Sequence, residues 1–119
     1  MPIQWEQESS DLLVVHISGK ILFSEFSNCQ LAMEPILQAQ GKMNYLVILQ
    51  DFAGWDEYDG WNDMSFIEKN DQYLSRFAIV GNEEWKDEAL VFMMAGLRPV
   101  DIRYFTSIEE ARQWLAGSS

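Results

Sequence analysis

The sequence predicts a layered α/β domain with a mostly parallel sheet, and three observations lead to this prediction. Short apolar or β-branched runs, typical of buried strands, alternate with segments whose apolar residues recur at steps of three and four, typical of helices. Strands that alternate with helices favour a parallel sheet covered by helices. The 119 residues fit one domain, and a hydrophobic content of 48 % is enough for a core. We therefore expect a single domain over residues 1–119.

The first predicted elements are a strand and a helix. Residues 12–18 form an apolar, β-branched run that predicts a strand, which Gly19 ends. The helix is expected to have Ser24 as its cap and to end at Gly41. Pro35 lies inside it, where it should kink or divide the helix. The face that repeats at helical spacing consists of Phe26, Cys29, Met33, Ile36 and Leu37.

The rest of the chain continues the alternation of strands and helices. Ser107 and Glu110 form a capping box, which predicts the start of a final helix. The elements before it are a central strand at 45–49, a helix at about 55–70, a strand at 77–80, a helix at about 83–95 and a last strand at 100–105.

The charge of the chain excludes some classes of partner. With 19 acidic and 8 basic residues, the formal net charge is −11. Such a surface repels phosphate, so nucleic-acid binding is not expected. The same repulsion opposes docking to an anionic membrane through basic residues, and peripheral membrane contact would have to use apolar side chains. The N-terminus lacks the pattern of a secretion signal, no apolar run approaches the length of a membrane span, and we expect a cytoplasmic protein.

Candidate catalytic and metal-binding residues are sparse. His16 is the only histidine, and it lies in mid-strand without a nucleophile motif nearby. Cys29 is the only cysteine and lies on an apolar helix face, where cysteine packs as a small hydrophobe. The acidic run around Gly60 does not match a calcium loop, because Trp55 takes the first ligand position. We therefore expect no catalytic residue, no metal and no cofactor.

Two segments carry more apolar surface than a small core needs. On a helix over 55–70, the residues Trp61, Met64 and Ile67 suffice as a core face, yet a second stripe of Trp55, Tyr58 and Phe66 accompanies them. Residues 89–97 are apolar around the whole circumference of the third helix. Protein, a ligand or a partner must cover this surface.

Several segments together resemble the SpoIIAA-like family of bacterial proteins, which is related to STAS domains and to CRAL-TRIO lipid-binding domains. The turns Asp-Phe-x-Gly-Trp at 51–55 and Val-Gly-x-x-x-Trp at 80–85 carry much of the resemblance. The resembling segments are 13–20, 46–56, 77–85, 103–105 and 110–115. The resemblance implies a STAS-like single domain with a mixed, mostly parallel sheet of four or five strands and about four helices. It also implies no enzymatic activity and a role in binding apolar ligands or associating with membranes.

One departure from related folds concerns regulation. Anti-sigma-factor antagonists with this fold carry a phosphorylatable Ser or Thr at the helix start after the central strand. Residues 51–56 of this chain have no hydroxyl there, and Ser65 lies too far along to substitute. A switch that works through phosphate charge is therefore not expected.

Two hypotheses for function follow. The first is a module that binds an apolar small molecule, such as a lipid or fatty-acid-like ligand, in a pocket between the second and third helices. The second is a protein-interaction module in which the same helices form a homodimer or a regulatory interface. In the first hypothesis the third helix swings about Gly81 and Gly96 to admit the ligand. The residues expected to line the pocket are Trp55, Tyr58, Phe66, Trp85, Phe92 and Met93.

Overall fold

The computed structural model describes residues 3–55 and 65–117, and a five-stranded sheet forms its centre. The strands lie in chain order, β1-β2-β3-β4-β5. Strand β1 is antiparallel to β2, and the other neighbours are parallel. The elements are β1 (Ile3–Ser9), β2 (Leu12–Ile21), α1 (Phe23–Gln40), β3 (Met43–Trp55), α2 (Ser65–Asn70), η2 (Asp71–Tyr73), β4 (Leu74–Val80), η3 (Glu83–Trp85), α3 (Lys86–Phe92), β5 (Asp101–Phe105) and α4 (Ile108–Leu115).

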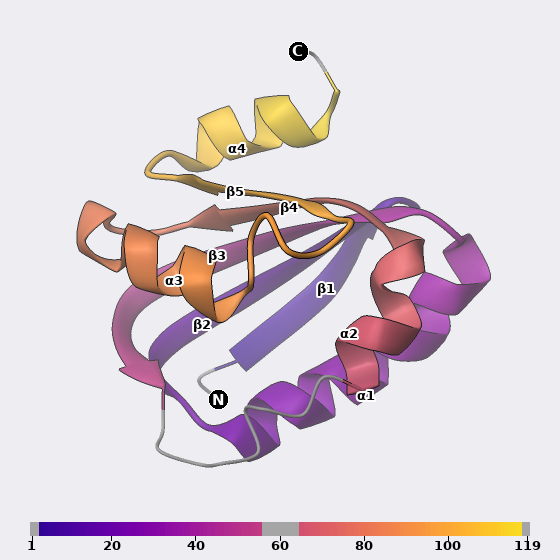
Figure 1. Ribbon diagram of the computed structural model, residues 1–119, viewed down its shortest axis with the longest axis horizontal. Coiled ribbons are helices and arrows are strands. Elements are labelled where there is room, and N and C mark those ends of the chain that lie inside the picture. The colour runs from indigo at the N-terminus through magenta and orange to yellow at the C-terminus, as the bar shows by residue number, and fades with distance from the viewer. Residues whose placement is uncertain (1–2, 56–64, 118–119) are drawn as a thin grey trace.

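Helices cover both faces of the sheet, as the predicted α/β class requires. Figure 1 shows α4 on one side of the sheet and α1 and α2 on the other. Alternate residues of β2 point to the two sides: Val15 belongs to the larger core with α1 and α3, and Val14 to the smaller core beneath α4. The prediction of a mostly parallel, mixed sheet in an α/β domain is confirmed.

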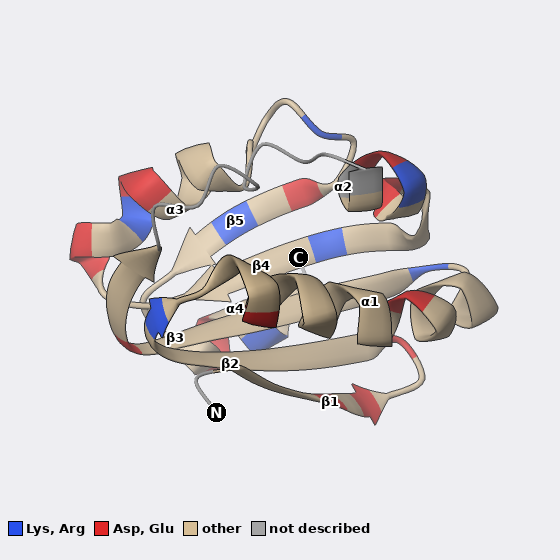
Figure 2. Cartoon of the chain, turned by 90° about the horizontal axis from the view of Figure 1, so that it is seen from below, with Lys and Arg blue, Asp and Glu red and all other residues tan. Residues whose placement is uncertain are grey.

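Charged side chains are unevenly spread over the molecule. Figure 2 shows acidic residues at η3 and α3, whereas α1 is largely uncharged. Glu25 and Glu34 are the acidic residues of α1, and it has no basic residue. Arg112 of α4 donates two hydrogen bonds to Glu8 of β1, at 2.6 and 2.9 Å, and thereby lowers the pKa of that carboxyl.

No helix among the described residues is long and apolar enough to cross a membrane.

The ends of α1 agree only in part with those predicted from the sequence. Gly41 ends the helix as predicted, at φ 90° with its N–H donating to the Leu37 carbonyl at 3.0 Å. The prediction that Ser24 caps the helix is wrong. The helix begins one residue earlier, and the cap position is taken by Leu22, whose side chain makes no capping hydrogen bond. The helix is also not divided at Pro35, which lies on its exposed side. Water can bond there to the carbonyl that proline leaves unpaired.

The prediction of a helix over 55–70 is wrong at its start. Strand β3 continues to Trp55, where the helix was expected to begin, and the described part of the predicted helix is α2, Ser65–Asn70. The pairing of β3 with β2 shifts register at Gly19, and Asp51 of β3 has a left-handed backbone (φ 52°). These irregularities let β3 bend and continue past Asp51, where the sequence suggested that the strand ends. The stripe of Trp55, Tyr58 and Phe66 is therefore not one helical face. Of the remaining residues in that prediction, Tyr58, Trp61 and Met64 lie outside the described residues, as does the side chain of Ile67.

The third helix is shorter than the sequence predicted. The turn η3 leads into α3, which ends at Phe92, and left-handed backbone at Met94 (φ 56°) and Gly96 (φ 86°) turns the chain toward β5. Gly81, which we expected to be a flexible point, is closely packed. A Cβ at this position would lie 2.5 Å from the Tyr104 hydroxyl oxygen, so only glycine lets the Tyr104 side chain approach the backbone this closely.

The cap of α4 gives a prediction about stability. The Ser107 hydroxyl accepts a hydrogen bond from the Glu110 N–H at 3.3 Å. Replacing Ser107 by Ala should lower the free energy of unfolding by about 1 kcal/mol, since the N–H loses its partner. Ser24→Ala is the matched control and should change it by less than about 0.5 kcal/mol. Urea denaturation measures both, and an equal loss in the two variants would contradict the assigned cap.

Candidate ligand-binding cavity

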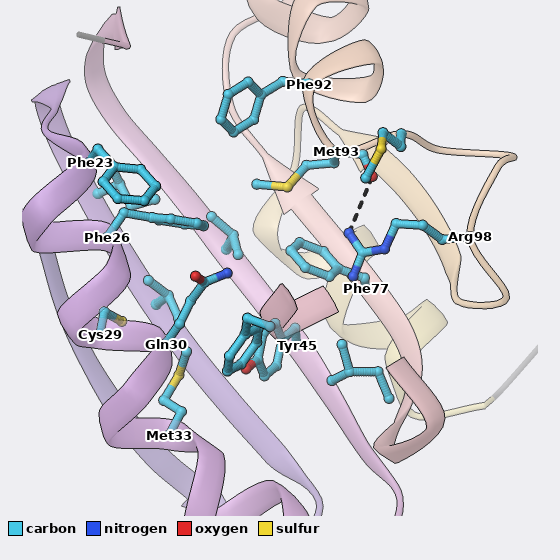
Figure 3. Close-up of a pocket in the computed structure, with 16 residues that line it drawn as sticks. Phe23, Phe26, Cys29, Gln30, Met33, Tyr45, Phe77, Phe92, Met93 and Arg98 are labelled. Atoms are coloured by element: carbon cyan, nitrogen blue, oxygen red, sulfur yellow. Dashed lines mark hydrogen bonds between the residues drawn. The ribbon is translucent and has the colours of Figure 1, made fainter. Parts of the chain in front are cut away.

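A cavity of about 480 Å³ lies between the sheet and the helices on its larger-core side. This volume is within the range of small-molecule pockets, about 300–1,000 Å³. Figure 3 shows side chains from α1, the strands and the segment after α3 around it. The lining residues are Val15, Ile17, Phe23, Phe26, Cys29, Gln30, Met33, Tyr45, Val47, Phe66, Leu74, Phe77, Phe92, Met93, Met94 and Arg98.

Helix α1 supplies one wall of the cavity. Phe23, Phe26 and Gln30 recur at steps of three and four, so they lie on one face of the helix, and Cys29 and Met33 extend it. Figure 3 shows these residues on the side of α1 that meets the cavity. The sequence assigned most of this face to the core, but the side chains opposite it leave space unfilled.

The sheet and the segment after α3 complete the enclosure. Tyr45 and Phe77 come from the neighbouring strands β3 and β4, and their rings meet edge to face with centroids 5.2 Å apart. Met93 and Met94 follow α3 and contribute flexible, polarisable side chains. The result is an apolar enclosure with few polar groups.

A buried ion pair fixes the segment after α3 to η2, the turn that precedes β4. Arg98 donates to Asp71 from Nε at 2.9 Å and from Nη2 at 2.6 Å. Its Nη1 donates to the Met93 carbonyl at 3.2 Å. The side chains of Arg98 and Asp71 are only 6 % and 9 % exposed. The charge of Arg98 is therefore balanced within the protein.

Two further polar groups on the cavity wall are buried. Burial raises the pKa of the Cys29 thiol to about 11, so the thiol is neutral near pH 7 and packs as the sequence predicted. Burial also raises the pKa of Tyr45, which stays protonated. The Tyr45 hydroxyl has no hydrogen-bond partner among the described residues.

Three of the six residues expected to bind a ligand line the cavity. They are Phe66, Phe92 and Met93. Trp55 and Trp85 lie in an adjoining aromatic cluster, with ring centroids 6.0 Å apart, and Tyr58 lies outside the described residues. The cavity lies against the sheet and α1, whereas we expected it between the second and third helices. That position rested on the incorrect extent of the second helix.

The aromatic cluster joins the two turns that stood out in the sequence. Phe52 packs against Trp55 and Trp85, with ring centroids 5.0 and 4.8 Å away. A Cβ at Gly54, which has φ 101°, would lie 3.6 Å from the Trp85 ring. Phe92 packs on Trp55 at 4.5 Å and also lines the cavity. The cluster therefore borders the cavity and connects it to the turns.

A second hollow lies at β1 and β2 and has a different character. Its lining includes polar residues from three strands, and His16 is among them. His16 is exposed, and it lies on the face opposite Val15 and Ile17, so it does not approach the cavity. Within 3–55 and 65–117, no group of three or more His, Cys, Asp or Glu is placed to hold a metal ion. The lining of the hollow is Gln4, Trp5, Glu6, His16, Ile17, Ser18 and Gln50.

Comparison with known proteins identifies the family of this chain. A family model described as SpoIIAA-like matches residues 12–116, which include every residue that lines the cavity. The chain belongs to the SpoIIAA-like family. A search of curated proteins with the sequence finds no significant match.

Solved structures share the SpoIIAA-like fold. An uncharacterised Shewanella loihica PV-4 protein with a SpoIIAA-like fold is 21 % identical, with a TM-score of 0.63 over 95 % of this chain and 91 % of that one. The anti-sigma factor antagonist SpoIIAA in its unphosphorylated form is 13 % identical, with a TM-score of 0.67 over 97 % of this chain and 96 % of that one. At these identities the likeness concerns the fold.

The buried ion pair of this SpoIIAA-like chain gives a second prediction about stability. Asp71→Ala leaves the Arg98 charge buried and unpaired, and should lower the free energy of unfolding by about 3–5 kcal/mol. The control is Asp101→Ala, which breaks an exposed pair with Arg103 and should cost less than about 1 kcal/mol. Urea denaturation compares the two, and similar small losses would contradict a buried pair.

The thiol on the cavity wall gives a prediction about pH. Alkylation of Cys29 by iodoacetamide should accelerate up to about pH 11, because the thiolate reacts and burial raises the thiol pKa to about 11. A free cysteine peptide, with a thiol pKa of about 8.5, should level off about 2.5 pH units earlier. Mass spectrometry gives both rates, and circular dichroism checks that the protein stays folded. A plateau for Cys29 at the pH of the peptide would show that the thiol is not buried.

Proposed function

We propose that this protein is a non-catalytic module that binds an apolar small molecule of lipid or fatty-acid type. The observation that supports the proposal is the 480 Å³ cavity in the larger core. Protein interiors are normally packed as densely as organic crystals, with few voids larger than a water molecule. This space is partly open to solvent and leaves apolar side chains in contact with water, and a ligand that fills it would bury them.

The cavity sets the size of the ligand. If each non-hydrogen atom takes up about 30 Å³, as a water molecule does, the 480 Å³ hold roughly 16 such atoms. This matches a medium-length alkyl chain with a small head group. Phenylalanine and methionine side chains suit an occupant of variable shape, since methionine is flexible and polarisable.

The arrangement of nucleophile and base supports a role without catalysis. Cys29 is the thiol of the cavity wall, and its raised pKa of about 11 keeps it protonated. Nucleophilic catalysis needs a base within hydrogen-bond reach. His16 lies on the other face of the sheet and cannot serve. Binding is thus the function that this site serves best.

Access to the cavity would involve the segment from α3 to Arg98. We propose that this segment moves about Gly96, whose left-handed backbone has open space around it. Gly81 is too closely packed to be the second pivot. The ion pair of Arg98 with Asp71 would hold this segment in place between binding events.

An interaction module is the second candidate function. Val91 and Leu97 are 77 % and 84 % exposed, and in sequence they lie on either side of Phe92, Met93 and Met94, which line the cavity. A partner protein, a second copy of the chain or a membrane surface would cover them. Residues 51–55 carry no hydroxyl group, so such a role would work without the phosphate switch.

A cavity-filling variant tests the proposed function. Cys29→Phe places a ring in the cavity and should weaken binding of decanamide at least about tenfold while leaving the fold intact, since the ligand and the ring compete for the same volume. The matched control is Leu31→Phe on the exposed side of α1, where Leu31 is 60 % exposed. Isothermal titration calorimetry measures both affinities. Equal binding by the two variants would place the ligand elsewhere, and no binding by the unmodified protein would refute the function.

A further inference from the structure

The polar groups of the cavity determine what kind of head group a ligand can carry. Most lining residues are apolar, and three offer strong hydrogen-bonding groups: Gln30, Tyr45 and Arg98. Figure 3 shows the Gln30 amide extending from α1 into the cavity between Phe26 and Tyr45. The head group of an amphipathic ligand would have to be accommodated by these three residues.

Arg98 does not supply a free positive charge. Its Nε and Nη2 donate to the two oxygens of Asp71, and its Nη1 donates to the Met93 carbonyl. Both partners of the ion pair are more than nine-tenths buried. Arg98 is the single basic residue among the described residues that line the cavity. A carboxylate placed here would have to share this cation with Asp71.

An anionic head group is therefore disfavoured. A carboxylate that leaves water needs an opposite charge or several hydrogen-bond donors to replace its hydration. The cavity provides a guanidinium that is already balanced, and the chain as a whole carries a net charge of −11. A neutral head group avoids both difficulties.

The Tyr45 hydroxyl provides the complementary observation. Tyr45 is 5 % exposed and lines the cavity, and its hydroxyl has no hydrogen-bond partner among the described residues. A buried hydroxyl without a partner is unfavourable. The hydroxyl oxygen is itself covered by neighbouring side chains in this structure, so a ligand oxygen that displaces them and accepts its hydrogen bond would remove that penalty. The hydroxyl stays protonated, because burial raises its pKa, and so acts as a donor.

We propose that the cavity selects ligands with an alkyl chain and an uncharged head group that accepts a hydrogen bond, such as an amide, ester, ketone or alcohol, over free carboxylates. The head group lies at Tyr45 and Gln30, and the chain lies among the phenylalanine and methionine side chains. The inference rests on the proposed function, because it names the class of ligand for the same cavity.

Two ligands of equal length test the proposal. Decanamide and decanoate have the same chain and differ in an NH₂ group in place of a charged oxygen. Isothermal titration calorimetry near neutral pH should give decanamide at least about tenfold tighter binding, because only decanoate must lose the hydration of a charge. Equal or tighter binding of decanoate would overturn the preference for a neutral head group and leave the proposed function standing. Binding of neither ligand would refute both.

A variant of Tyr45 tests where the head group lies. Tyr45→Phe removes an unpartnered hydroxyl and keeps the ring, so the protein should fold as before. It should weaken decanamide binding by about fivefold to tenfold, since the hydrogen bond to the head group is lost. Tyr73→Phe is the matched control, because Tyr73 lies in η2 and does not line the cavity. Unchanged affinity in Tyr45→Phe would contradict the assigned position of the head group.

Discussion

The structure depends on one constraint: the parallel strands of the sheet must be covered on both faces. Helix α4 meets this need on one face with a small core that includes Val14, Leu46 and Ala111. On the other face, α1, α2 and α3 lie along the sheet, and their side chains do not fill the space between them. The cavity is thus a consequence of how the second face is covered. Its floor is the centre of the sheet, and its other walls come from the helices and from the segment after α3.

The aromatic cluster ties the edge of this cavity to the turns at the ends of β3 and β4. Phe52 and Trp55 come from the last residues of β3, and Trp85 comes from η3. Phe92 contacts Trp55 in the cluster and also faces the cavity. A change in the position of α3 would therefore alter both the aromatic cluster and the wall of the cavity. At the far end of the same segment, Arg98 is fixed by Asp71. The mobile wall we propose is thus held by ring packing at one end and by an ion pair at the other.

The sequence predicted the fold more completely than the site. The apolar runs at 12–18, 45–49 and 77–80 all fall within strands of the sheet, because continuous apolar residues are typical of strands covered on both faces. The last predicted strand, 100–105, matches β5 except for its first residue. Strand β1 was not predicted, since its only buried side chain is Ile3 and it shows no clear alternation. The start of the helix assigned to 55–70 was wrong, because a bulged strand can pass through Asp51 and Gly54, which looked like a strand end.

The sequence predicted only part of the lining of the cavity. Periodicity correctly assigned Cys29 and Met33 to the inner face of a helix, but it cannot show that the opposing residues leave a void. Phe23 was missed because it precedes the Ser24 at which the helix was expected to begin. A lone arginine in an otherwise apolar stretch, Arg98, was the available sign of a buried ion pair. That the Tyr45 hydroxyl has no partner within the described part of the chain depends on three-dimensional packing and has no signal in the sequence.

The central claim is that the space beside α1 holds a ligand, and nuclear Overhauser contacts between methyl groups and a bound ligand test it most directly. With methyl-labelled protein and unlabelled decanamide, we expect contacts from the ligand chain to the Met33 and Met93 methyl groups, which line the cavity. Val91 and Leu97, which are exposed, should show none. Contacts confined to Val91 and Leu97, with none to Met33 and Met93, would place the ligand on the surface and contradict the account.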